Sequence, residues 1–426
     1  MDLRRVVVVG ANRIPFARAN SQYAHLSNQD MLTATFDGLV ARTGLAGERV
    51  GEVAAGAVLK HARDFNLTRQ AVLGSQLDPH TPACDVQMAC LTSMQAALLI
   101  AAKIATGQID SGIAGGSDTA SDVPVAVNEG FREVLLDLAR ARTMQQRLAA
   151  VARLRPGQVV PELPTNAEAR TGLSMGEHQA VTTAELGITR RAQDELAVAS
   201  HHNLAAAYDR GFFDDLVTGH AGLTRDGNLR PDTDTEAMGE LKTVFGSGPD
   251  ATMTAGNSTA LTDGASAVLL GSQDWAQHRN LPTLARIVDA QTAAVDHVHG
   301  GEGLLMAPTY AVSQLLDRQG LSLQDFDFYE IHEAFAATVL SHLAAWESER
   351  FCADRLGRDA PLGGIDRDKL NTTGSSLATG HPFAATGTRI LATMAKLLAD
   401  KGSGRGLISI CGAGGLGVAV ILEAVN

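Results

Sequence analysis

Two stretches of the sequence share one order of features: AALLIAAKIATGQIDSGIAGG, residues 96–116, and RILATMAKLLADKGSGRGLISICGAGG, residues 389–415. In each, apolar residues at helical spacing are followed by a polar connection and an apolar run that ends in glycines. A helix leading into a buried strand is the building unit of α/β folds. The repetition therefore predicts an internal duplication, with two similar α/β halves lying side by side. Chance similarity between two α/β units is the alternative that these stretches alone leave open.

The residues around these stretches extend both halves. The run RRVVVVG, residues 4–10, predicts a buried parallel strand because it is apolar without alternation. Further elements are expected from the same kinds of pattern. They are a helix at 28–42, a strand at 50–59, a helix at 68–74, a strand and then a helix within 327–346, a helix at 386–402 and a last strand at 418–426.

A region of different character, residues 124–253, separates the halves. Its loops are rich in Pro, Gly and Asp, as in LTRDGNLRPDTDTEAMGE, and its helical patches are isolated. Long insertions of this kind usually cover functional sites. We therefore expect four segments: an N-terminal half at 1–123, an inserted loop domain at 124–253, a return to the N-terminal half at 254–282, and a C-terminal half at 283–426.

Composition limits the classes of function. The chain has 426 residues, of which 45% are hydrophobic and 19% charged, as in ordinary globular proteins. Its net charge of −12 argues against general nucleic-acid binding, which needs a basic surface. No apolar run approaches the roughly 18 residues of a membrane span. No signal or transit segment is recognisable before the first strand, and 4 cysteines are too few for a disulfide framework, so we expect a cytoplasmic protein.

The glycines near the C-terminus match a dinucleotide-binding fingerprint, since Gly412 to Gly417 read G-x-G-x-x-G. That motif needs a strand before it, a helix after it and an acid about 20 residues on for the ribose. Only VAVILEAVN follows, and it predicts one more strand. We therefore expect a tight strand-to-strand turn that lets a ligand approach the backbone beside Cys411.

Two residues with reactive side chains precede predicted helices. Cys90 stands before the helix of the first stretch, where backbone N–H groups favour a thiolate. His381, in GHPFAATG, stands before the helix of the second stretch and is placed to activate a thiol. If the two helices meet across a pseudo-twofold axis, these residues come together. The alternatives are a small core residue for Cys90 and a helix cap for His381; Cys84 and Cys352 fit the core role.

His332 and Glu333, in EIHEAF, follow an apolar strand, where α/β proteins keep their sites. A metal site on the helix that follows would need another ligand three or four residues further on. Those positions, Phe335 and Ala336, carry no ligating group. The sequence therefore predicts no metal here.

Four of these motifs resemble those of one enzyme family. CLTS at Cys90, HEAF at His332, GHP at His381 and CGAGG at Cys411 stand in the order and at plausible separations for the thiolases. AGNSTALTDGAS and SMGE also look like thiolase segments, so the resemblance covers essentially the whole chain. It implies an α/β protein with the thiolase-like duplicated five-layer α/β/α/β/α fold, and an inserted loop domain that covers CoA and the acyl chain.

The resemblance also implies an acyltransferase that cleaves 3-oxoacyl-CoA with CoA, or runs the reverse Claisen condensation, through a cysteine acyl-enzyme. Cys90 is then the acylated nucleophile, and His381 activates it and helps bind a thioester oxygen. Cys411 moves the proton of the acetyl Cα, and His332 helps polarise the thioester carbonyl. Backbone amides near Cys90 and Ala413 can supply further N–H donors to an enolate oxygen. No metal or redox cofactor is required, and CoA and acyl-CoA are substrates.

Several positions depart from the commonest thiolase pattern. They are His332 in place of Asn, CLTSM in place of a form with Gly after the Ser, Ala413 in place of Gly, Thr259 in place of Ser, and Ser174 where short-chain biosynthetic enzymes often have His. Together they resemble the fatty-acid β-oxidation branch, including the bacterial trifunctional complex. An acetoacetyl-CoA-forming biosynthetic thiolase is the alternative. The second cysteine, Cys411, disfavours a ketoacyl synthase, and Cys90 with both histidines disfavours a non-catalytic lipid-carrier or scaffold relative.

The resemblance places CoA mainly on the insertion and the adjoining N-terminal half. The residues expected to contact it are Lys242 near the nucleotide, Thr252, Thr259, and Met175 and Met306 along the pantetheine channel. A core role is the alternative for each Met. Expected partners are a second copy of the chain, as a homodimer or a dimer of dimers, and a hydratase–dehydrogenase subunit.

One segment of the insertion is basic. VLLDLARARTMQQRLAAVARLRPG, residues 134–157, predicts one helix with an apolar face, because apolar residues recur at spacings of three and four. The apolar residues are Val134, Leu138, Ala141, Met144, Leu148 and Val151, and the basic ones are Arg140, Arg142, Arg147, Arg153 and Arg155, against the single acid Asp137. Three roles are open: a cover helix over the acyl tunnel, docking onto an acidic partner subunit, or contact with an anionic membrane surface. Of the last two, the partner subunit is preferred.

Overall fold

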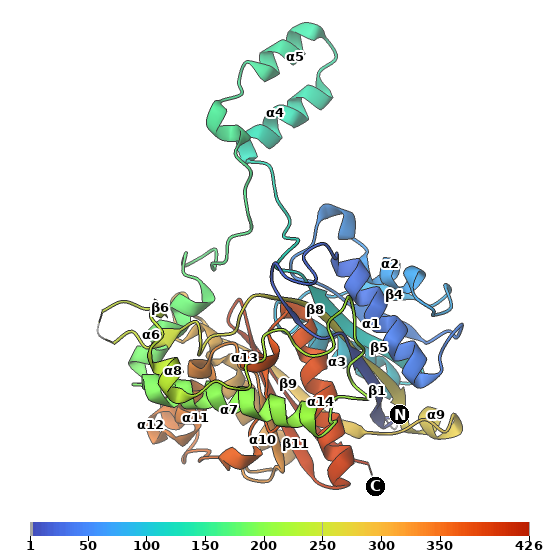
Figure 1. The fold of residues 1–426 in the computed structure, drawn as a ribbon, viewed down its shortest axis with the longest axis vertical. Helices are drawn as coiled ribbons and strands as arrows, with labels where there is room; N and C mark the ends of the chain where they lie inside the picture. Colours follow the sequence, from blue (N-terminus) through green and yellow to red (C-terminus); the bar gives the residue numbers. More distant parts are fainter. Residues whose placement is uncertain (1–2, 249, 426) are drawn as a thin grey trace.

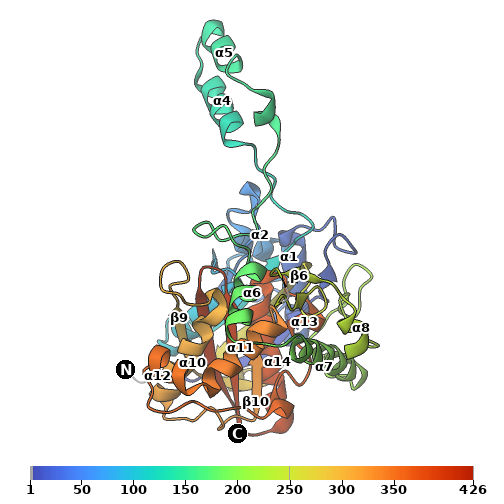
Figure 2. The ribbon, with the colours of Figure 1, turned by 90° about the vertical axis from the view of Figure 1, so that its left-hand side faces the viewer.

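The computed structural model describes residues 3–248 and 250–425. An α/β body carries most of the chain, and an arm of two short helices projects away from it (Figures 1 and 2). The strands are β1 (Val6–Arg13), β2 (Ala17–Arg18), β3 (Glu52–Ala55), β4 (Ala83–Asp85), β5 (Ser111–Asp118), β6 (Thr243–Phe245), β7 (Met253–Thr254), β8 (Thr262–Ser272), β9 (Ala285–Ala294), β10 (Phe328–Ile331), β11 (Arg405–Gly412) and β12 (Leu416–Ala424).

The helices occupy both faces of the sheet, the insertion and the arm. The α-helices are α1 (Asn28–Thr43), α2 (Leu67–Gly74), α3 (Thr92–Ala105), α4 (Glu129–Arg140), α5 (Met144–Val151), α6 (Met175–Glu185), α7 (Arg190–Asp209), α8 (Thr235–Gly239), α9 (Gln273–His278), α10 (Ala307–Gln319), α11 (Ala336–Glu347), α12 (Glu349–Leu356), α13 (Ser376–Thr379) and α14 (Thr386–Lys401). The 3₁₀ turns are η1 (Ala62–Asp64), η2 (Pro156–Val159), η3 (Leu304–Met306), η4 (Arg367–Lys369) and η5 (Phe383–Ala385). In the part of the chain that the structure describes, no helix has the length and apolarity that crossing a bilayer requires.

The main sheet repeats one pattern of strands, in the order β4-β3-β5-β8-β1-β9-β12-β11-β10. In the first half β3 is parallel to β4 and β5, and β8 is antiparallel to β5 and β1. In the second half β10 is parallel to β11, and β12 is antiparallel to β11 and β9. The halves join where Val7 and Val8 of β1 pair antiparallel with Arg286 and Ala285 of β9. Because the same pattern runs outward from this junction in both directions, the predicted duplication is confirmed.

β1 corrects one expectation about strand direction. The run at residues 4–10 was expected to form a parallel strand, but β1 is antiparallel to both of its neighbours. Val6 and Val8 pack into one apolar cluster, and Val7 and Val9 pack into another on the opposite face of the sheet. Burial on both faces therefore explains the absence of alternation, and it says nothing about the direction of the neighbouring strands.

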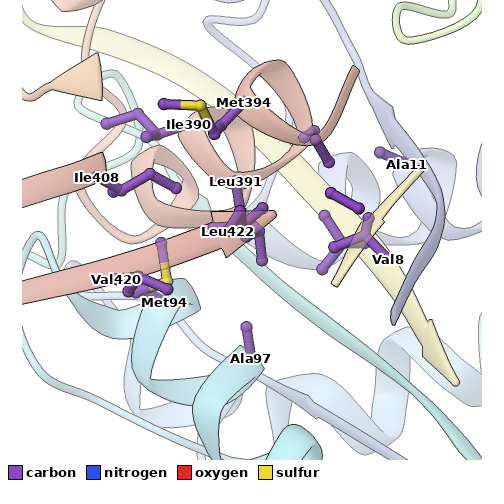
Figure 3. Packing of buried hydrophobic residues seen from close by; sticks show 14 of the residues in the cluster. Val8, Ala11, Met94, Ala97, Ile390, Leu391, Met394, Ile408, Val420 and Leu422 are labelled. Atoms are coloured by element: carbon purple, nitrogen blue, oxygen red, sulfur yellow. The ribbon is translucent and has the colours of Figure 1, made fainter. Parts of the chain in front are cut away.

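Apolar clusters lie on the outer face of each half of the sheet, and one more surrounds the helices between the halves, which gives the five layers of the predicted fold class. One outer cluster lies between α1–α2 and the first half of the sheet, and the other lies between the second half and α10–α11. The central cluster is shared by both halves. Figure 3 shows Met94 and Ala97 of α3 meeting Ile390, Leu391 and Met394 of α14, with strand residues of both halves around them.

The starts of α3 and α14 touch at the centre of the molecule. A Cβ atom on Gly387 would lie 2.4 Å from the backbone nitrogen of Met94, closer than any side chain permits. The backbone N–H of Thr388 donates to Ser93 Oγ across the same contact, at 2.9 Å. Because Gly387 has no side chain, the residues that precede each helix are brought face to face.

The inserted region contains more helix than its sequence suggested. Isolated helical patches were expected, yet α7 runs for 20 residues, and Thr189, which directly precedes it, caps the helix by accepting from the Ala192 N–H. Leu204 and Ala207 of α7 join the central apolar cluster. Packing against the body therefore stabilises a helix whose own apolar pattern is weak.

The arm corrects the expectation of a single helix at residues 134–157. α4 ends at Arg140, and α5 begins at Met144 after Thr143, which forms a reciprocal capping box with Gln146. The T-x-x-Q pattern was the local signal for this break. The cover-helix role is also wrong, because both helices stand clear of the body in two views (Figures 1 and 2). Ala126 and Glu162 pair antiparallel where the two connecting segments lie side by side.

The contact at Gly387 gives a stability test. Gly387→Ala should lower the free energy of unfolding by about 1–3 kcal/mol, because the added methyl group overpacks against the α3 backbone. Gly239→Ala is the matched control, since a Cβ there meets nothing within 4 Å and the change should stay within about 0.5 kcal/mol. Chemical denaturation at equal protein concentration measures both. Equal stability of the two variants would contradict the close packing.

Candidate active site

Cys90 and His381 meet at the contact between the two halves. The distance from Cys90 Sγ to His381 Nε2 is 3.1 Å. Ala89 has a left-handed backbone, with φ of 47°, and turns the chain sharply just before Cys90. Thr92 Oγ1 holds this turn by accepting from the Met88 N–H and donating to the Ala89 carbonyl. The structure therefore brings together the two residues that the duplicated frame predicted to meet.

Burial sets the resting state of the Cys90 thiol. It raises the pKa of Cys90 to about 12, although the backbone N–H groups of Ala413 and of Cys90 itself act in the opposite direction. The nearby Asp118 carboxylate raises this pKa further. The thiolate-stabilising amides that the sequence predicted are present, but burial outweighs them. Cys90 therefore rests as a thiol and needs a base.

Hydrogen bonds hold His381 in the position that a base for the Cys90 thiol requires. Its Nδ1 lies 2.5 Å from Thr386 Oγ1, and its backbone N–H donates to Thr262 Oγ1 at 2.7 Å. Burial, and secondly the charge of Arg389, lower the pKa of His381 to about 3, so the imidazole is neutral. With Nδ1–H donating to Thr386, the Nε2 lone pair faces the Cys90 thiol and can accept its proton.

Cys411 is the second-last residue of β11 and lies beside the same loop. Its side chain is buried, and burial together with the neighbouring Cys90 raises its pKa. The following turn has left-handed glycines at 414 and 415 and returns directly into β12, as the sequence predicted. A Cβ atom on Gly412 would lie 3.1 Å from Leu91 Cγ, so the turn passes close to the Cys90 loop. A second, protonated thiol therefore stands next to the first.

His332 completes the group at the end of β10. The centroid of its ring lies 4.3 Å from that of His381. Its Nδ1 is 3.0 Å from Ser376 Oγ, while its Nε2 is buried and has no partner among the described residues. Burial, followed by the nearby His381, lowers the pKa of His332 well below the ordinary value. The structure thus gathers all four predicted reactive residues around one point.

Two buried carboxylates hold the loops of this site. Glu333 accepts from Ser200 Oγ, Asn371 Nδ2 and the Leu377 N–H, so it faces the scaffold. Asp118, at the end of β5, accepts from the N–H groups of Val58, Leu59 and Ala384. Burial raises the pKa of Asp118 to about 6.

Sequence reasoning missed three residues that support the reactive groups: Asp118, Thr386 and Ser376. Each carries a common polar side chain and acts only through contacts between segments far apart in the chain. The position of Asp118 at the glycine-rich end of a strand was the one available signal.

A cavity of about 380 Å³ opens beside Cys90. Its walls are largely apolar and include the predicted Met175, with Leu163 and Leu261 more than half exposed at its rim. Cys90 itself, Phe383 and Ala413 also line the cavity. Such a cavity suits the hydrocarbon chain of a substrate whose reacting carbon lies at Cys90.

The other residues predicted to contact CoA lie apart from one another. Thr252 lines a second cavity, of about 370 Å³, beside α6. Lys242 is exposed next to β6. Thr259 Oγ1 donates to the Ser376 carbonyl, which makes it part of the scaffold near His332. Met306 is buried and lines neither of the two cavities described here.

Known proteins resemble this chain along its whole length. The family model described as "Thiolase, N-terminal domain" matches residues 6–274, and "Thiolase, C-terminal domain" matches residues 281–424. The 3-ketoacyl-CoA thiolase of Yersinia pestis (strain Pestoides F) is 36% identical, over 98% of this chain and 97% of that protein. Two solved structures superpose closely on this chain. That of the acetyl-CoA acetyltransferase of Bacillus anthracis does so with a TM-score of 0.82; the two sequences are 27% identical, and the superposition covers 100% of both chains. Human mitochondrial 3-ketoacyl-CoA thiolase has a TM-score of 0.81, 26% identity and 99% coverage of both chains.

Because the pKa of Cys90 is raised, the reactivity of its thiol near neutral pH should depend strongly on His381. In His381→Ala, alkylation of Cys90 by iodoacetamide near neutral pH should slow by about 100-fold, since a positioned general base contributes on this scale. His342→Ala is the control, because it removes an equally buried imidazole that contacts the Leu305 carbonyl instead. Peptide mass spectrometry follows the labelling of each cysteine. An unchanged rate at Cys90 in His381→Ala would show that the thiol needs no base.

Proposed function

Because the chain belongs to the thiolase family, we propose that it cleaves 3-oxoacyl-CoA with CoA in fatty-acid β-oxidation, releasing acetyl-CoA and a shortened acyl-CoA. The chain is an acyltransferase, and both family domains and the full-length relatives support this assignment. The observation that carries the mechanism is the 3.1 Å contact between Cys90 Sγ and His381 Nε2. Thiolysis is reversible, so the same groups also serve the condensation in the reverse direction.

The first step forms an acyl-enzyme on Cys90. His381 Nε2 takes the thiol proton as Sγ bonds to the C3 carbonyl carbon of the substrate. The C2–C3 bond then breaks, the acyl group stays on sulfur, and the electron pair of the broken bond becomes the enolate of acetyl-CoA. His381 is left as an imidazolium. The buried site favours this order, because neither group carries a charge before substrate arrives.

The second step quenches the enolate. Cys411, which burial keeps protonated, gives its proton to the enolate carbon and becomes a thiolate. Acetyl-CoA then leaves. Negative charge on the enolate oxygen needs aimed N–H donors. The buried Nε2 of His332, which has no partner in the described part of the chain, is suited to this role. The amides of Cys90 and Ala413, which already face the resting sulfur, suit the oxygen of the acyl-enzyme.

The third step returns the enzyme to its starting state. The thiol of incoming CoA gives its proton to the Cys411 thiolate, and the CoA sulfur attacks the acyl carbon on Cys90. Cys90 leaves and regains its proton from the His381 imidazolium. We propose that Met175 contacts the chain of the substrate in the cavity beside Cys90, and that Thr252 and Lys242 serve the more distant part of CoA.

The proposed setting is the cytosol, and all four cysteines are free thiols, as a reducing compartment allows. We also propose a homodimer, alone or as a dimer of dimers. β4 is the last strand at its end of the main sheet, and an unpaired sheet edge is a natural surface for a second copy.

The arm is proposed to dock onto an acidic surface of a hydratase–dehydrogenase partner. Residues 138–161 contain five arginines and no acid, in a chain of net charge −12. The side chains of Met144 and Leu148 are 69% and 63% exposed, and only Val134 and Ala150 of the two arm helices are buried. No other described segment of the chain covers this apolar surface with its basic border, and the surface is complementary to an acidic, partly apolar partner.

Acylation tests the role of Cys90. Cys90→Ser should abolish the acyl-enzyme that forms on incubation with acyl-CoA, because the hydroxyl is far less acidic than the thiol and a poorer leaving group. Intact-mass spectrometry measures the adduct, and Cys84→Ser is the control that should still acylate. Acylation that persists in Cys90→Ser and maps to Cys84 or Cys352 would refute the assignment.

Proton exchange tests the role of Cys411. Cys411→Ala should still accept an acyl group on Cys90, but it should lose the exchange of acetyl-CoA α-protons with deuterium by roughly 100-fold or more. His381→Ala should be impaired in both reactions, because its imidazole contacts the nucleophile and is expected also to help bind the thioester oxygen. NMR of acetyl-CoA in heavy water follows the exchange, and a wild-type rate in Cys411→Ala would rule out this role.

Charge reversal tests the arm. Replacing Arg140, Arg142 and Arg147 with Glu should abolish co-purification with the hydratase–dehydrogenase subunit at low salt and leave thiolysis of short substrates unchanged. The control replaces Arg191, Arg225 and Arg350, which are exposed on the body, with Glu. Loss of the complex in both variants, or wild-type binding only to anionic liposomes or to a second copy, would contradict the proposed partner.

A further inference from the structure

Ser376 lies between the reactive His332 and a buried arginine. Its Oγ is 3.0 Å from His332 Nδ1 and 2.7 Å from Arg389 Nη2. Arg389 Nη1 donates to the neighbouring Ser375 Oγ at 3.1 Å. All four side chains are at most 2% exposed, so no solvent competes for these hydrogen bonds. Neither the thiol chemistry nor the substrate cavity accounts for this chain of contacts.

The direction of each hydrogen bond follows from which atoms carry protons. A guanidinium only donates, so Ser376 Oγ accepts from Arg389. The single hydroxyl proton of Ser376 then needs an acceptor, and within residues 3–248 and 250–425 the only one recorded for it is His332 Nδ1. If Nδ1–H donated to Ser376 instead, the hydroxyl proton would be buried without a partner, which is unfavourable. The hydroxyl therefore donates to Nδ1, and the ring carries its proton on Nε2.

The charge of Arg389 reinforces this arrangement. Burial lowers the pKa of Arg389 only to about 10, so it stays protonated near neutral pH, and Glu330 Oε2 lies 3.7 Å from Nη1. A fixed positive charge polarises the Ser376 hydroxyl toward His332 and disfavours a second proton on the imidazole. The ring is therefore neutral and its tautomer is set.

We propose that Ser376, held by Arg389, is a positioning residue that fixes His332 as the Nε2–H tautomer, so that this N–H is the preset donor to the substrate oxygen. The inference rests on the proposed thiolysis and adds the group that prepares His332 for it. The Nε2 atom is buried and has no partner among residues 3–248 and 250–425, which fits a donor whose acceptor arrives with the substrate. Without Ser376, the ring loses both its tautomer preference and its fixed orientation.

The test compares two neighbouring serines that share one guanidinium. Ser376→Ala removes the hydroxyl that contacts His332. Ser375→Ala removes a hydroxyl that contacts Arg389 and, in the part of the chain that the structure describes, makes no hydrogen bond with His332. Nitrogen-15 NMR of histidine-labelled enzyme reports the tautomer of His332, assigned from the signal lost in His332→Asn. Steady-state thiolysis gives kcat and KM for each variant. Ser376→Thr, which keeps the hydroxyl, is the conservative rescue.

We expect wild type, Ser375→Ala and Ser376→Thr to hold the proton of His332 on Nε2, and Ser376→Ala to show mixed tautomers. In Ser376→Ala, kcat should fall about tenfold, the scale of one hydrogen bond, with KM little changed. A wild-type proton on Nδ1, an unchanged tautomer in Ser376→Ala, or an equal loss in Ser375→Ala would overturn the proposal. Absence of thiolysis in the wild type would refute the proposed function instead, and the NMR result would still decide the tautomer.

Discussion

The contact between the starts of α3 and α14 is the constraint on which the rest of the structure depends. Each helix belongs to one half of the duplicated fold, and each is preceded by one member of the Cys90–His381 pair. The glycine at 387 allows the two backbones to approach, and the central apolar cluster holds them there. Neither half contains both members of the pair. The proposed reaction therefore takes place at the interface between the two halves. A change in packing at this interface should also change the distance between Cys90 and His381.

Burial then determines how protons are held. It raises the pKa of Cys90 and Cys411 and lowers the pKa of His332 and His381, so each group rests in its neutral form. An exposed site would stabilise ionised side chains before substrate arrived. In this buried site the thiols and imidazoles stay neutral until the substrate carbonyl is present. Neutral groups still need orientation. The hydroxyls of Thr386 and Ser376 supply it, one to each imidazole.

The sequence was sufficient for the parts of this account that depend on local pattern. Helix-then-strand repetition predicted the duplication. Strand direction at β1 was wrong, because an apolar run reports burial on two faces and not the neighbour's orientation. The break in the arm was missed because the apolar spacing continues across it, although Thr143 and Gln146 marked the cap. Ser376 and Thr386 escaped notice because their roles depend on partners that only the folded chain brings near. The proposed CoA contacts, among them Lys242 and Met306, remain predictions.

A single-turnover experiment decides whether Cys90 carries the acyl group during the reaction. The purified chain is mixed with a 3-oxoacyl-CoA in the absence of free CoA, quenched at intervals, and measured for released acetyl-CoA and for added mass on each cysteine. We expect a burst of one acetyl-CoA per chain, with one shortened acyl group on Cys90, and renewed turnover only when CoA is added. Release of acetyl-CoA that requires CoA from the start, with no acyl group on the enzyme, would contradict this expectation.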